Sequence, residues 1–231
     1  MALAFVRKSP NTLTPQEEPG VPVTTADLTL TAAPAVGNLL VLVMAFYRVG
    51  GGPVPPDTLT DNHGNTWVVD RTQSRGNGAV AICSTIVETT GDPFTITFET
   101  DGTSWWTVWG CMEYSGNAQT LGAAAVNSAG VDTSTLNSGT VSPAGNALYV
   151  GVCTTNDGAA VTLASGSFTE RYREPIWTVQ IIEAADLIDS GSQSCEWTVS
   201  GTHGMAGAIA AYNEAVATQN IPPGLLSGRV L

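Results

Sequence analysis

Lysine, histidine and charge of either sign are scarce in this chain of 231 residues. Charged residues make up 12% of it, Lys8 is the single lysine, and His63 and His203 are the two histidines. The 20 acidic residues outnumber the 8 basic ones, which gives a formal net charge of −12. Because such a surface repels phosphate backbones and anionic lipid headgroups, we expect neither nucleic acid nor a membrane as a partner.

The sequence also lacks the motifs of common catalytic and metal sites. Neither histidine has a Ser, Cys or carboxylate at a spacing that predicts a catalytic triad, and there is no P-loop, nucleophile elbow or H-E-x-x-H motif. The cysteines form no C-x-x-C pair, which argues against zinc; they are Cys83, Cys111, Cys153 and Cys195. We predict no catalytic residues, no metal and no cofactor, and four buried thiols in preference to disulfides.

Signals for export are missing as well. The basic pair Arg7-Lys8 follows a very short apolar stretch, which is the reverse of the order in a secretory signal. We therefore expect no export signal and a protein made in the cytoplasm. Hydrophobic residues make up 43% of the chain, so an ordered core is expected.

Two similar apolar segments organise the sequence. A Gly-Asn pair precedes an almost wholly apolar run at residues 37–47, and a similar arrangement returns at residues 145–153. Each run is too short to span a bilayer and is rich in branched apolar residues, which is typical of a strand buried on both faces. We predict that these two strands lie at the centre of the core.

Other strands recur in the same order, which indicates an internal duplication. The segment around Leu39 matches Ala147 onward at a shift of 108, Ile82 matches Ile181 at a shift of 99, and Tyr114 matches Tyr212 at a shift of 98. Insertions that fall in loops explain the drifting shift. Ten to twelve short strands with frequent turn residues predict an all-β, antiparallel, jelly-roll-like sandwich.

The ends of the chain differ from its middle. Residues 1–20 are predicted to form an extended N-terminal arm, residues 21–213 the sandwich with halves at about 24–116 and 132–213, and residues 214–231 a C-terminal arm. Apolar side chains in the arms need a surface to cover them, so we expect them to tether neighbouring subunits. These candidates are Phe5, Val6, Leu225, Leu226, Val230 and Leu231.

Three further groups of residues are candidates for ligand binding or catalysis. Trp105 and Trp109 lie on one face of a predicted strand, roughly 13 Å apart, and would stack on sugar rings if exposed. Residues 61–65 have some likeness to a calcium loop but are better explained by a hairpin turn. A sugar hydrolase would need two converging acids, and the candidates are Glu88, Glu99, Glu113, Glu183 and Glu196.

Taken in order, several segments between residues 24 and 213 resemble a loosely related set of bacteriophage virion proteins. The segments are T-L-T, A-A-P-A-V-G-N-L-L-V-L, T-D-N-H-G-N-T-W, F-T-I-T-F and M-E-Y-S-G. The set comprises minor capsid, head-decoration and minor tail proteins with a jelly-roll-like sandwich.

This resemblance implies a building block of the virion that is not an enzyme and that assembles in the host cytoplasm. Its partners would be the major capsid protein or tail proteins, and it would form a homo-oligomer. An alternative is a carbohydrate-binding module that attaches to host glycans through Trp105 and Trp109. On the first hypothesis, removing residues 1–20 or 221–231 leaves the sandwich folded and weakens incorporation into particles.

Overall fold

The structure is a computed structural model that describes residues 2–9, 12–14, 25–47, 56–100, 106–116, 122–123, 125–176 and 180–215. Within these ranges the regular elements are fifteen β-strands, and all strand pairs are antiparallel. The prediction of an all-β antiparallel sandwich is confirmed. The strands are more numerous than the ten to twelve predicted, and the jelly-roll assignment stays a prediction.

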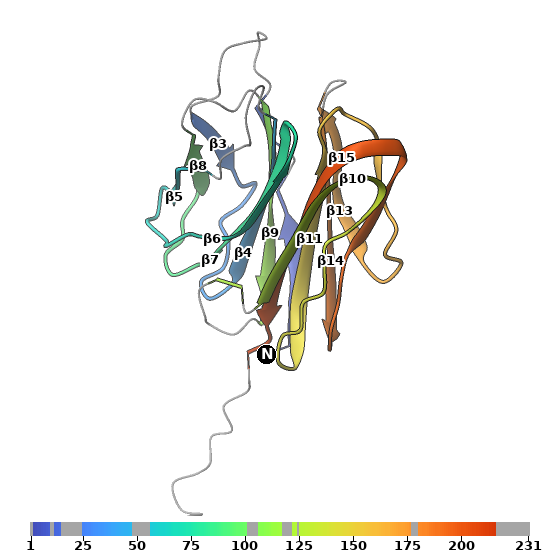
Figure 1. Ribbon diagram of the computed structural model, residues 1–231. Helices are drawn as coiled ribbons and strands as arrows, with labels where there is room; N and C mark the ends of the chain where they lie inside the picture. Colours follow the sequence, from blue (N-terminus) through green and yellow to red (C-terminus); the bar gives the residue numbers. More distant parts are fainter. Residues whose placement is uncertain are drawn as a thin grey trace, which may run out of the picture.

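The first unit is a sandwich of a large and a small sheet. The large sheet has the order β1 (Ala4–Lys8), β9 (Trp106–Ser115), β4 (Leu39–Tyr47), β7 (Gly78–Ile86), β6 (Val68–Arg75), and β2 (Thr12–Thr14) also pairs with β9. The small sheet has the order β3 (Thr25–Thr29), β8 (Thr95–Glu99), β5 (Thr58–Asp61). In Figure 1 the small sheet lies at the far left, against the large one.

The second unit repeats this arrangement, and most strands of its large sheet are longer. Its sheet has the order β10 (Ala125–Asn137), β15 (Glu196–Asn213), β11 (Asn146–Thr155), β14 (Gln180–Ser190), β13 (Thr169–Ile176). The start of β15 pairs with the end of β10 and with β12 (Val161–Leu163), and these three segments take the place of the small sheet.

The two large sheets have the same strand order, which supports the predicted duplication. Their bulges also correspond, because β6 has a register shift between Val69 and Arg71 and β13 has one between Glu170 and Tyr172. The residue alignment predicted from sequence needs correction. Leu39 pairs with Tyr114 as Leu148, not Ala147, pairs with Tyr212.

The same correction applies to the neighbouring strand. Ile82 pairs with Val43, and Ala184 pairs with Val152, so Ala184 rather than Ile181 corresponds to Ile82. Both errors are odd numbers of residues. Since side chains alternate between the faces of a strand, each error exchanges the two faces of its strand.

The units pack face to face through their large sheets. One core cluster combines Leu39, Val41 and Val43 of β4 with apolar residues of β11 and β15. Two other clusters fill the individual sandwiches, and the opposite face of β4, with Leu40 and Leu42, belongs to one of these. The strands β4 and β11 are therefore apolar on both faces because each separates two cores, and their predicted central position is confirmed.

The two sandwiches place their large core ring at different positions of the repeat. In the first unit the Trp109 ring meets Phe98 edge to face, with 4.6 Å between ring centroids. In the second unit the large ring is Trp197, and a Cβ added at Gly207 would lie 3.1 Å from it. Each sandwich thus has a tryptophan in its core, contributed by β9 in one unit and by the start of β15 in the other.

A glycine at the interface between the units makes room for a ring. A Cβ added at Gly110 would lie 2.5 Å from the Tyr172 ring, whose hydroxyl is fixed by hydrogen bonds. We expect Gly110→Ala to lower the free energy of unfolding by about 2 to 3 kcal/mol, because the buried ring has nowhere to move. Urea unfolding measures this. Gly166→Ala, which meets no atom within 4 Å, is the control with a change near zero, and equal effects would contradict the packing argument.

The first residues of the chain are not a free arm. β1 and β2 pair with β9, Leu3 is buried, and the Phe5 ring packs against Tyr114 with 5.7 Å between centroids. The Phe5 ring is thus packed on its own chain, whereas Val6 is 46% exposed, and the tethering role of both residues stays a prediction. Removal of residues 1–20 is expected to uncover the core, contrary to the sequence-based prediction.

The C-terminal prediction falls mostly outside the described residues. Strand β15 ends at Asn213, and the last described contact is the hydrogen bond that the amide of Ala215 donates to the carbonyl of Gly116. The remaining predicted tethering residues, Leu225, Leu226, Val230 and Leu231, lie beyond that point.

Candidate functional site

Two tyrosine–aspartate hydrogen bonds lie where the two units meet. The Tyr114 hydroxyl of β9 donates a hydrogen bond to Asp186 of β14 at 2.7 Å, and the Tyr212 hydroxyl of β15 donates one to Asp70 of β6 at 2.7 Å. Each tyrosine comes from the end of a strand in one unit and meets an acid of the other. The two tyrosines correspond in the repeat, but their acids do not, because Asp186 of β14 takes the place of Ser84 of β7, and Asp70 of β6 takes the place of Arg171 of β13.

The acids of these two bonds have different surroundings. Asp186 also accepts a hydrogen bond from Nε of Arg171 at 2.8 Å and is almost fully buried. Asp70 accepts one from the amide of Ala123 at 2.7 Å, and burial raises the pKa of its carboxyl. Burial, first of all, and the neighbouring acid raise the pKa of each tyrosine well above the usual value, so both hydroxyls remain donors.

Strand β1 adds a second set of bonds between the units. Lys8 donates a hydrogen bond to the carbonyl of Arg171, and the Tyr172 hydroxyl donates to the carbonyls of Ser9 and Cys111 at 3.1 and 2.8 Å. Tyr172 is buried, so these bonds are shielded from water. The edge strands β1 and β13 are held together at this side.

On the opposite side, side-chain bonds also link the sheet edges at β6 and β10. Arg71 and Arg75 of β6 reach Ser128 and Asp132 of β10, and the Arg75–Asp132 pair is bidentate. Both residues of that pair are exposed, so this ion pair contributes little energy. It nevertheless covers the edges of β6 and β10, and both sides of the double sandwich are therefore linked.

The predicted glutamates have separate environments. Glu113 is buried and accepts hydrogen bonds from Arg7, from Asn38 and from the amide of Ala35. Glu183 is buried in the second unit without a hydrogen-bonded partner among the described residues, and Glu88 and Glu99 are exposed. Glu113 is thus a structural acid that anchors β1 and the turn before β4.

Trp109, one of the two predicted sugar-stacking residues, does not lie on the surface. Trp109 is fully buried between the sheets of the first unit, so its predicted role in carbohydrate binding is wrong in this structure. Both faces of β9 are covered, one by the small sheet and the other by the second unit. Trp105 lies outside the described residues.

The segment at residues 61–65 is a turn, as predicted, although it does not close a hairpin. Asp61 accepts hydrogen bonds from the amides of His63 and Asn65 and from Nε1 of Trp67. The strands on either side, β5 and β6, belong to different sheets. The carboxylate is therefore occupied by protein donors, which leaves a structural role for this turn.

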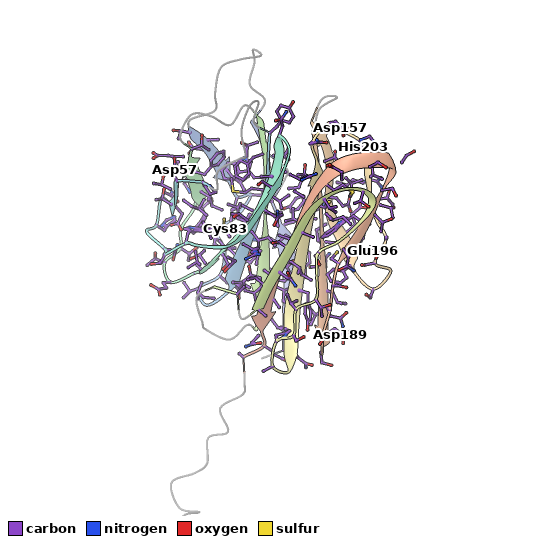
Figure 2. The ribbon with its side chains drawn as sticks, viewed as in Figure 1. Asp57, Cys83, Asp157, Asp189, Glu196 and His203 are labelled. Atoms are coloured by element: carbon purple, nitrogen blue, oxygen red, sulfur yellow. The ribbon has the colours of Figure 1, made fainter. Side chains whose placement is uncertain are left out.

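The histidines and cysteines have local partners. His63 stacks on Phe94, and His203 lies against Asp157, with 2.5 Å between Nδ1 and the carboxylate. Figure 2 shows Asp157 and His203 together near the top of the second unit, away from Cys83 in the first. All four cysteines are free and buried, which confirms the prediction, and burial raises the pKa of each thiol.

Within the described ranges, no group of three or more His, Cys, Asp or Glu side chains is placed to hold a metal ion. Across the same ranges, no helix is long and apolar enough to cross a membrane. Comparisons with known protein families, with curated proteins and with solved structures found no match to this chain.

Proposed function

We propose that this protein is a structural component of a bacteriophage particle that has no enzymatic activity, either a capsid decoration or minor capsid protein or a minor tail protein. Its partners would be the major capsid protein or tail proteins, with assembly in the host cytoplasm. The observation that carries the proposal is that side-chain bonds link the edges of the two large sheets, between β6 and β10 and between β1 and β13.

Linked sheet edges suit a protein that folds completely before it joins a particle. Exposed strand edges pair with other chains, so covering them keeps a β protein discrete at the high local concentration of an assembling particle. The net charge of −12 supports the same role, because like charge keeps copies apart until a specific contact forms. The resemblance of residues 24–213 to virion proteins adds to this support.

Purified particles test the proposal. A strain that encodes the chain is induced to produce phage, particles are banded by density, and the protein is sought with a specific antibody and located by immunogold labelling. We expect the chain to band with particles at a fixed number of copies. Its presence in the lysate but not in banded particles would overturn the proposal.

The C-terminal residues supply a sharper prediction. We expect deletion of residues 221–231 to leave the melting temperature unchanged, because the last described strand ends at Asn213. Occupancy on particles should fall by at least about tenfold, because the deletion removes the apolar residues Leu225, Leu226, Val230 and Leu231. Val36→Ser, at a valine that is 62% exposed on the body, is the matched control with normal occupancy. Normal occupancy of the truncated protein would contradict the tethering role.

A further inference from the structure

A buried acid lies beneath the smallest strand of the second unit. Glu183 of β14 is directly opposite Cys153 of β11 and Arg173 of β13. Its side chain is fully buried, and among the described residues neither carboxylate oxygen has a hydrogen-bond partner that meets the usual geometry. A buried carboxyl without a hydrogen-bond partner is costly to ionise.

Strand β12 packs next to β14, which carries this acid, and the amides of Ala164 and Ser165 just after it donate hydrogen bonds to the carbonyl of Glu196. Within the described residues its three residues pair with β15 alone, while Val161 and Leu163 pack into the core of the second unit. Arg173 donates a hydrogen bond from Nη2 to the Thr162 hydroxyl at 3.2 Å. The Nε atom of the same arginine is 3.7 Å from Glu183, so Arg173 joins β12 to the buried acid.

The charged and titratable groups around Glu183 come from three strands. Glu170 and Arg173 lie on β13, and Cys153 lies on β11. Cys195 immediately precedes β15, and β12 has no titratable side chain. Burial, first of all, and the negative charge of Glu170 raise the pKa of Glu183 from 4.5 to about 8, and Arg173 lowers it in part. The covered carboxyl is thus neutral at pH 7, whereas in water it would be ionised.

We propose that β12 is a flap over the second unit and that its opening is coupled to the release of one proton from Glu183. Opening admits water to the carboxyl and uncovers the Cys153 thiol. The Arg173 side chain keeps the flap closed through Thr162. Because the open state holds one proton fewer than the closed state, the opening equilibrium depends on pH.

The expected pH dependence has a definite form. Between the pKa of the exposed acid, 4.5, and that of the covered acid, about 8, the opening constant should rise about tenfold per pH unit. Above pH 8 it should level off, since both states are then ionised. Below pH 4.5 it should be constant, since both are protonated.

Thiol labelling of the full-length protein tests the proposal. An uncharged alkylating reagent is applied from pH 5 to pH 9.5, at concentrations where labelling is slower than reclosing, and mass spectrometry of peptides gives the rate at each cysteine. Dividing each rate by that of the unfolded protein at the same pH removes the intrinsic thiol reactivity. Cys83, buried in the first unit, reports global unfolding.

We expect the corrected rate at Cys153 to follow the predicted curve and to exceed that at Cys83. Glu183→Gln should abolish the pH dependence, and Glu170→Gln should move the plateau to lower pH, because it removes the neighbouring negative charge. A corrected rate at Cys153 that does not change with pH, or that changes equally in Glu183→Gln, would overturn the proposal. Equal rates at Cys153 and Cys83 would also overturn it, because opening would then be global.

Discussion

Replacing Asp186 by alanine is expected to lower the free energy of unfolding by about 3 to 5 kcal/mol, since it breaks a buried ion pair by removing one partner. The Tyr114 hydroxyl and the Arg171 guanidinium both lose their acceptor at the interface between the units. Arg171 also stacks on Phe5, 3.7 Å from the ring centroid, so strand β1 should loosen. Guanidinium unfolding at pH 7, followed by circular dichroism, measures the change.

The repeat supplies the matched control. Asp70→Ala removes the acceptor of Tyr212, which is the counterpart of Tyr114, but no arginine among the described residues is bonded to Asp70, and burial has raised the pKa of that carboxyl. We expect a loss of about 1 to 2 kcal/mol, the cost of one unsatisfied buried hydroxyl. Equal effects of the two substitutions would show that the Arg171–Asp186 pair does not stabilise the interface.

Glu183→Gln is expected to stabilise the protein by about 4 kcal/mol at pH 8.5, because a tenfold change in an acid dissociation constant corresponds to about 1.4 kcal/mol. The pKa of Glu183 is higher in the folded protein, about 8, than its usual 4.5. The wild-type protein therefore loses stability as the pH rises from 4.5 to 8 and loses no more above that. The glutamine has no proton to release, so its stability should not show this loss.

Thermal unfolding from pH 5 to pH 9 checks this prediction. At pH 5 the two proteins should differ little in melting temperature, because the folded carboxyl is neutral and nearly the same in shape as the amide, and only a small part of the loss has occurred. Glu196→Gln, at a partly exposed acid of the same unit, is the control without a pH-dependent gain. A constant difference between wild type and Glu183→Gln at every pH would contradict the assigned cause.

The fold class followed from the sequence because alternation and turn residues are local signals. The apolar runs of β4 and β11 also indicated burial on both faces. They did not say what lies against each face. A run apolar on both sides fits the middle of one large sandwich as well as the boundary between two, and the second arrangement is the one observed.

Errors at the N-terminus and around Trp109 have related causes. Prolines at residues 10 and 15 suggested an arm, although Leu3, Phe5 and Arg7 alternate as an edge strand requires. For Trp109, alternation indicated which face of the strand it occupies but not the small sheet that covers that face. Glu183 was visible as one acid within the apolar run 181–185, and its isolation there was the available signal for a buried carboxyl.

The bonded edges also determine how copies of this protein can meet. The side-chain bonds from β6 to β10, and those that join β13 to the end of β1, place a neighbour against each of these edges, so they hinder the addition of strands from a second molecule there. Contacts between copies are then expected through loops, chain ends, the outer faces of the cover sheets or the edges of the small sheet at β3 and β5. Since the two halves of the body differ in sequence, such contacts would give an array of copies a built-in direction.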